Sequence, residues 1–289
     1  YKCHTHNYAA MNRREILAGV GSILAFALPE TFASAQETAK ISRESIKLNM
    51  PGFSFAEAYN LAFMCDYIYG RGTPKPDGWD IVFDCPQLMP LANKWQLWKS
   101  TKLDNAYAII IRGTVDQSGS VLEDLFSLLI TAKGSINSGK YSIPYNFSNN
   151  PSASVHAGFA LGSLVLLHYP LVGILDQLKR RAIPSNSRVF VAGHSQGAAV
   201  ATLIRSYLQF SNNTQINEYQ YKSYFFAQPK PGDEGYSADF DSNFSNGGNA
   251  FRITNSLDWV PQVPLTIELL SDLSIPNPFT NKNTLSTSN

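Results

Sequence analysis

Residues 188–210, RVFVAGHSQGAAVATLIRSYLQF, place a serine between two glycines at the junction of two unlike segments. The first segment, Arg188 to Ala192, is rich in β-branched and aromatic residues, which is typical of a buried strand. The second, Ala198 to Phe210, consists largely of helix formers with helical spacing of its apolar residues. The five residues between them must therefore form a tight turn, so the chain is restricted to folds in which a strand passes directly into a helix.

The turn itself has the spacing G-x-S-x-G of a nucleophile elbow. A serine held on so sharp a bend leaves no room for side chains two residues before or after it, and Gly193 and Gly197 clear that space. The hydroxyl then lies at a helix N-terminus, where N–H groups and the helix dipole favour developing negative charge. We predict that Ser195 attacks a carbonyl carbon; the alternative is a small-residue turn that packs a helix on a sheet. His194 should point into the body of the protein.

The rest of the chain alternates short β-rich runs with longer helical patterns. We expect strands at 80–84, 95–99, 106–112, 188–192, 221–227 and 249–254, and helices at 54–70, 122–130, 158–181 and 198–210. This alternation predicts an α/β fold with a mostly parallel sheet covered by helices on both faces. The ligand site is then expected at the carboxyl ends of the strands.

Composition limits the class of protein further. Charged residues make up 16% of the 289 residues and hydrophobic residues 44%, which suits one large globular domain. The formal net charge of +1 and the lack of a Lys/Arg-rich block argue against a nucleic-acid partner. The sequence contains neither a C-x-x-C motif nor a His/Cys cluster with zinc spacing, so no metal is expected. Cys65 and Cys85 permit a disulfide, and two separate buried thiols are the alternative.

The N-terminal region resembles an export signal. Met11 is followed by Arg13 and Arg14, an apolar run over 16–28, and small residues at Ala33 and Ala35. This pattern predicts a signal peptide at 11–35 and a mature chain without a transmembrane segment; a buried first helix is the alternative. The arginine pair favours the twin-arginine route of a bacterium, with a periplasmic or extracellular protein as the product. Residues 1–10 precede Met11, and their status stays open.

Five motifs occur here in the order and at roughly the spacings of the class 3 lipase family. They are AIIIRGT, VHAGF, GHSQGAA, FFAQPKPGD and RITNSLDWVPQVP, within residues 54–265. The resemblance implies an α/β-hydrolase domain over 36–289 that needs no cofactor. It also implies that the enzyme hydrolyses carboxylic esters of acylglycerols through an acyl-enzyme. A phospholipase, a short-chain esterase and a non-catalytic lipid-binding relative are the alternatives.

The same resemblance implies roles for individual residues. Ser195 matches the nucleophile and Asp258 the acid that orients a catalytic histidine. Thr114 and the backbone N–H of Gln196 match the two donors of the oxyanion hole. His156 matches a position that is usually structural.

A segment after the oxyanion strand resembles the lid of a lipase. Its apolar residues at helical spacing are Leu122, Leu125, Phe126 and Leu129. Such a segment suits a lipid or ester substrate met transiently at a lipid interface. An ordinary packed helix is the alternative.

The general base is missing from its expected place. In this fold the triad runs Ser, Asp, His along the chain, but all five histidines precede Asp258. The histidines are His4, His6, His156, His168 and His194. Three explanations stay open: a domain truncated at Asn289 with its base downstream, a contribution from His4 or His6, or a relative that has lost catalysis.

Overall fold

A computed structural model describes residues 51–88, 92–113, 128–138, 141–211, 214–255, 258 and 260–262. The chain divides into two units, 1–48 and 49–289, and every described residue belongs to the second unit. The predicted signal peptide, Thr114 and the lid candidates Leu122, Leu125 and Phe126 lie outside the described residues.

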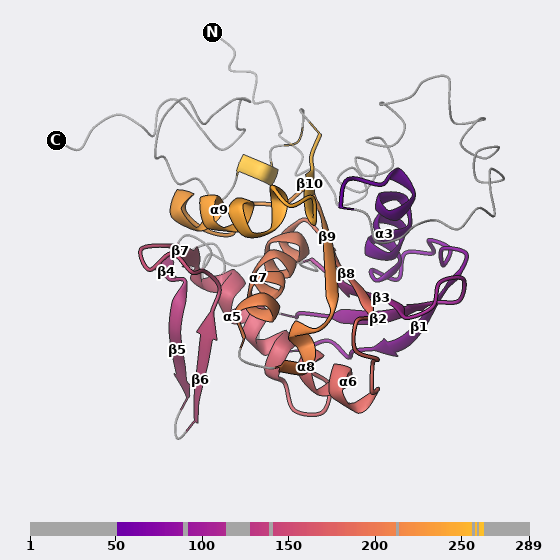
Figure 1. The fold of residues 1–289 in the computed structure, drawn as a ribbon, viewed down its shortest axis with the longest axis horizontal. Helices are drawn as coiled ribbons and strands as arrows, with labels where there is room; N and C mark the ends of the chain where they lie inside the picture. Colours follow the sequence, from indigo (N-terminus) through magenta and orange to yellow (C-terminus); the bar gives the residue numbers. More distant parts are fainter. Residues whose placement is uncertain are drawn as a thin grey trace, which may run out of the picture. The chain divides into compact units, whose positions relative to one another are not determined.

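A six-stranded sheet forms the centre of the described unit (Figure 1). Its strand order is β1-β2-β3-β8-β9-β10, with β1 at Trp79–Asp84, β2 at Trp95–Ser100, β3 at Ala106–Ile111, β8 at Arg188–His194, β9 at Gln220–Phe226 and β10 at Ala250–Ile253. The four strands β3, β8, β9 and β10 run parallel, and β2 and β1 add an antiparallel edge. All six residues of β3 are buried, as its apolar sequence predicts for a central strand. The prediction of a mostly parallel sheet is confirmed.

Helices cover both faces of this sheet (Figure 1). The helix α3 (Phe55–Tyr67) covers one face, where its Glu57 pairs with Lys222 of β9. The helices α5 (Ala157–His168) and α7 (Gln196–Phe210) lie on the other face, where Arg205 of α7 stacks on Tyr221 of β9. Side chains at 221 and 222 point to opposite faces because strand residues alternate. The remaining helical segments are α6 (Ile174–Arg180), α8 (Thr214–Asn217), α9 (Glu234–Phe240), η1 (Asp241–Ser245) and η2 (Val260–Gln262).

The helix predicted over 158–181 is wrong as a single element. It ends at His168 and restarts at Ile174 as α6. Pro170 has no N–H to donate, and it forces Tyr169 out of the helical region to ψ 126°. The chain then turns through Leu171, whose φ is +68°, before Gly173 starts the next helix.

The predicted helix over 122–130 is wrong at its C-terminal end. Leu129 is not part of a lid helix but begins β4 (Leu129–Thr131), which pairs with β7 (Ser154–His156). Ile130 and Thr131 are β-branched, and β7 offers them a ladder, so tertiary pairing overrides the helical spacing. A hairpin of β5 (Lys133–Ser138) and β6 (Tyr141–Asn146) follows and projects from the unit (Figure 1).

The two cysteines do not pair. Cys65 lies in α3 and Cys85 directly after β1, and both are buried and free. Burial raises the pKa of the Cys85 thiol to about 11, which makes it unreactive at neutral pH. Of the two alternatives from the sequence, the separate buried thiols are the correct one.

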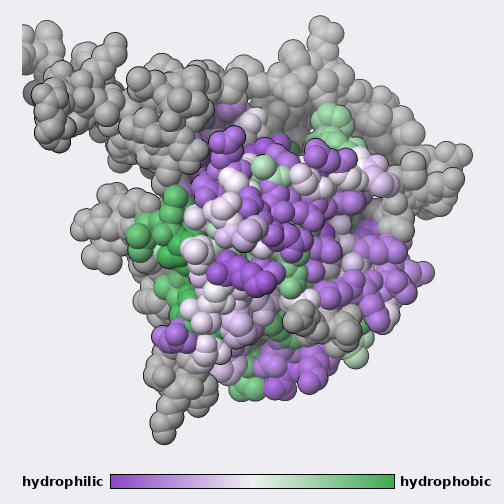
Figure 2. Space-filling model, turned by 60° about the vertical axis from the view of Figure 1, so that its left-hand side comes forward, coloured by the Kyte–Doolittle hydropathy of each residue, from purple (hydrophilic) through white to green (hydrophobic). Residues whose placement is uncertain are grey.

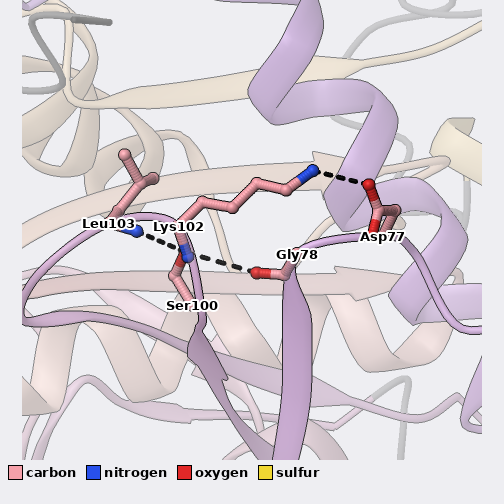
Figure 3. Close-up of polar contacts among 5 residues, drawn as sticks. All are labelled: Asp77, Gly78, Ser100, Lys102 and Leu103. Carbon is pink, nitrogen blue, oxygen red and sulfur yellow. Dashed lines mark hydrogen bonds and ion pairs between the residues drawn. The ribbon is translucent and has the colours of Figure 1, made fainter. Parts of the chain in front are cut away.

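A polar clamp holds the start of β1 to the end of β2 (Figure 3). The Ser100 hydroxyl donates to the carbonyl oxygen of Gly78 and accepts from the N–H groups of Lys102 and Leu103. Lys102 also forms an exposed ion pair with Asp77 at 2.5 Å. The Ser100 hydrogen bonds tie the two strands of the antiparallel edge together, away from the parallel strands that carry the elbow.

The visible face in Figure 2 is mainly hydrophilic, with hydrophobic residues at its left edge and in smaller groups at the upper right and the bottom. Among the described residues, no helix combines the length and the apolar character needed to cross a bilayer.

Candidate active site

The backbone at Ser195 has a strained conformation. Ser195 lies between the end of β8 and the start of α7 with φ +56° and ψ −134°. Few non-glycine residues adopt a positive φ, and such a residue keeps this conformation only where the surrounding structure enforces it. Here the Ser195 N–H donates to Phe226 at 2.9 Å, and the Ser195 carbonyl accepts from Ala198 at 2.8 Å.

The two flanking glycines are required by close backbone contacts. A Cβ on Gly193 would lie 2.3 Å from the carbonyl oxygen of Gly197. A Cβ on Gly197 would lie 2.5 Å from the carbonyl oxygen of Ile111, at the end of β3. Neither contact is possible for a real side chain, so the steric reason for G-x-S-x-G is confirmed at both positions.

The elbow exposes its serine more than its neighbours. Ser195 is half-buried, whereas the side chains of His194 and Gln196 are buried. His194 is 3% exposed, and neither ring nitrogen has a hydrogen-bond partner within the described part of the chain. Burial, helped by the charge of Arg71, lowers the pKa of His194 to about 4. His194 is therefore a neutral, inward-pointing residue, as the sequence predicts.

The first turn of α7 supplies hydrogen-bond donors next to Ser195. The N–H of Gln196, the first helical residue, has no acceptor within its own helix. The helix dipole adds partial positive charge at the same end. This end of α7 therefore favours negative charge beside Ser195.

Asp258 follows β10, at the same carboxyl end of the parallel strands as Ser195. Its Oδ1 accepts from the N–H of Val260 at 3.0 Å, and its own N–H donates to Asn255. Desolvation by burial raises the pKa of the half-buried carboxyl, against the lowering effect of the Val260 hydrogen bond. Because β9 lies between β8 and β10, the strand axes that lead to the two residues are roughly 10 Å apart.

The described histidines are held in structural positions. His156 is completely buried in β7, and its N–H donates to Pro231. The ring of His168, at the end of α5, packs edge-on against Tyr207 of α7, and burial lowers its pKa. With His194 turned inward, the described residues do not identify the general base. They also contain no group of three His, Cys, Asp or Glu side chains arranged for a metal ion.

One neighbour of the elbow escapes sequence reasoning. The hydroxyl of Tyr69 accepts a hydrogen bond from the N–H of Gly113, just beyond β3. The two residues are 44 positions apart, and no motif links them. The one local signal is that Tyr69 follows the end of α3 and directly precedes Gly70.

The parallel sheet, the elbow after β8 and the carboxylate after β10 define an α/β-hydrolase. A family model described as lipase (class 3) matches residues 108–268, more than half of the chain. This chain belongs to the class 3 lipase family.

Comparison with individual proteins agrees with this assignment. The chain is 37% identical over 79 residues to a secreted mono- and diacylglycerol lipase of Malassezia restricta, covering 27% of this chain and 24% of that relative. It is 30% identical over 163 residues to a phospholipase A1-II of Oryza sativa subsp. japonica, covering 53% and 38% of the two chains. The chain thus spans between about a quarter and two fifths of these curated relatives. The solved Lip2 lipase from Yarrowia lipolytica aligns with a TM-score of 0.50 at 21% identity, over 73% of this chain and 74% of that one, and shares the fold.

Proposed function

We propose that this protein is a serine hydrolase that cleaves carboxylic esters of acylglycerol lipids, in the manner of a triacylglycerol lipase. The observation that carries the proposal is the strained, half-exposed Ser195 at the N-terminus of α7. Strained backbone of this kind clusters at active sites, and here it coincides with a helix N-terminus and a half-exposed hydroxyl. Family membership and the lipase names of its relatives support the substrate class.

In the proposed reaction, the Ser195 Oγ attacks the ester carbonyl carbon while a histidine held by Asp258 takes the hydroxyl proton. The oxyanion that forms accepts hydrogen bonds from the N–H groups of Gln196 and Thr114. The histidine then protonates the leaving alcohol, and water hydrolyses the acyl-enzyme by the same steps. No cofactor takes part in these reaction steps.

The general base of the proposal is a histidine outside the described residues. His156 and His194 are buried in the core, and the ring of His168 packs on α7 far along its length from Ser195. Asp258 is half-buried and lies beyond β10. As the proposed partner of the histidine, its carboxyl group marks where we expect this base to lie.

We also propose that the protein is exported and contacts lipid surfaces transiently. The signal-like pattern of residues 11–35 and the secreted relative of Malassezia support export. The twin-arginine route is supported by Arg13 and Arg14 alone.

Hydrolysis assays test the proposal. We expect release of fatty acid from triacylglycerol and diacylglycerol emulsions, and its loss in Ser195→Ala. A comparison of p-nitrophenyl butyrate with the palmitate ester separates an esterase from a lipase. Equal rates for wild type and Ser195→Ala would contradict the proposal.

A phospholipase is the second candidate, because the rice relative carries that name. Phosphatidylcholine vesicles in the same assay distinguish the two. Faster release from the phospholipid than from the acylglycerols would favour the phospholipase.

A further inference from the structure

Tyr69 connects the end of α3 to the end of β3. Its hydroxyl oxygen accepts a hydrogen bond from the N–H of Gly113 at 3.0 Å. The last ladder pair of β3 with β8 is Ile111 with Gly193, so Gly113 lies beyond the strand ladder. A side chain from the turn after α3 therefore binds the backbone that leaves β3.

Tyr69 is itself held from two sides. Its own N–H donates to the carbonyl of Asp66 at 3.1 Å, which continues the turn of α3. The guanidinium of Arg71 lies 4.6 Å from the centre of the Tyr69 ring. These two contacts favour the ring position from which the hydroxyl reaches Gly113.

Gly113 touches both Tyr69 and the elbow. A Cβ on Gly113 would lie 2.6 Å from the Tyr69 hydroxyl, 2.9 Å from the His194 carbonyl oxygen and 3.3 Å from the Gly197 nitrogen. The Tyr69 ring also meets the His194 ring edge-on, with centroids 6.5 Å apart. The backbone after β3 is therefore enclosed between Tyr69 and the residues on either side of Ser195.

We propose that Tyr69 is a positioning residue for ester hydrolysis: its hydroxyl fixes the backbone at Gly113 against the Ser195 elbow. This inference rests on the proposed function. Stabilisation of an oxyanion depends on donors that are placed before the reaction, and a shift of about 1 Å costs roughly 100-fold in rate. Without the phenol oxygen, the Gly113 N–H bonds to water, and the distance between β3 and the elbow is less closely defined.

Tyr69→Phe tests this role because it removes the hydroxyl and keeps the ring against His194 and Arg71. With p-nitrophenyl butyrate we expect kcat to fall about 10- to 100-fold, with KM within about twofold. A role in stability alone would lower Tm and the fraction of active enzyme and would leave kcat per active site unchanged. We expect Tm to fall by less than about 4 °C.

Tyr67→Phe is the matched control. Tyr67 is the last residue of α3, its ring packs edge-on against Trp98, and its hydroxyl has no partner in the described part of the chain. The same chemical change two residues away should leave kcat, KM and Tm unchanged. An equal fall of kcat in both variants would overturn the proposal.

Amide hydrogen exchange gives a readout that needs no turnover. Exchange of the Gly113 amide should be at least about tenfold faster in Tyr69→Phe than in wild type and unchanged in Tyr67→Phe. Equal protection of Gly113 in all three proteins, or an unchanged kcat in Tyr69→Phe, would overturn the role of Tyr69. If Tyr69→Phe loses protection of the Gly113 amide but the wild-type protein hydrolyses no ester, the proposed function is contradicted and the contact of Tyr69 with Gly113 is not.

Discussion

The N–H of Ser195 donates a hydrogen bond to the carbonyl oxygen of Phe226, the last residue of β9, across 2.9 Å. This bond extends the β8–β9 ladder by one step beyond the pair His194 and Phe226. The strained φ of Ser195 is therefore held by the sheet on one side and by the first turn of α7 on the other. The geometry of the proposed nucleophile depends on backbone contacts, and these lead to specific predictions.

Gly193→Ala should damage the elbow. The new methyl group would lie 2.3 Å from the carbonyl oxygen of Gly197, so backbone must move. We expect a loss of about 3 kcal/mol in the free energy of unfolding, measured by denaturant titration, and a loss of activity. Gly247→Ala is the control, because its new methyl group would be 3.5 Å from the nearest atom; a similar loss there would contradict the steric account.

Asp258→Asn should separate activity from stability. The amide keeps an oxygen for the Val260 N–H but lacks the negative charge that we propose orients a histidine. We expect kcat to fall by about 10³- to 10⁴-fold. Burial raises the pKa of Asp258, so ionisation costs folding free energy as pH rises through that pKa. The variant should thus be as stable as wild type at pH 7, or more stable; a clear loss of stability would contradict this reading.

The ion pair between Lys222 and Glu57 should contribute to the attachment of α3. The Lys222 Nζ lies 2.6 Å from the Glu57 Oε2, and the two side chains are only 10% and 11% exposed. The Tyr224 hydroxyl also donates a hydrogen bond to Glu57. Lys222→Met leaves the carboxylate buried without its cation, and we expect a loss of about 3 kcal/mol. The exposed pair of Lys102 with Asp77 is the control, and Lys102→Met should cause no measurable change in Tm. Recovery of stability in Lys222→Met/Glu57→Leu would confirm that the unpaired charge is the cause.

His194 should make the fold sensitive to acid. The unfolded chain binds a proton at this residue below about pH 6.5, whereas the folded chain does so only near pH 4. Between these values the unfolded state holds more protons, so stability falls as pH falls. From pH 7 to pH 4, we expect the free energy of unfolding of wild type to fall by about 3 kcal/mol relative to that of His194→Leu. Parallel pH curves for the two proteins would show that His194 does not titrate in this way.

Sequence reasoning predicts the elements whose signals are local. The apolar run of β3 and the strand-turn-helix around Ser195 both appear at the expected residues because burial and sterics act within a few positions. The break after His168 was also encoded locally, by Pro170, although the apolar spacing favoured one long helix.

Elements that depend on partners are less predictable. The hairpin of β5 and β6 is polar and contains Pro144, a residue that argues against a strand. Its two segments become strands because they pair with each other, which their separate sequences do not indicate. Likewise, the bond between Tyr69 and Gly113 joins the turn after α3 to the turn after β3, 44 residues apart in the sequence. Such contacts follow from the packing of α3 on the sheet, which no short pattern describes.

Covalent labelling by a fluorophosphonate tests the central claim, that Ser195 is an activated nucleophile, most directly. Intact-mass and peptide mass spectrometry of the labelled full-length protein should show one adduct per chain on Ser195, and none in Ser195→Ala. A folded wild type that remains unlabelled, or an adduct that persists in Ser195→Ala, would contradict the account.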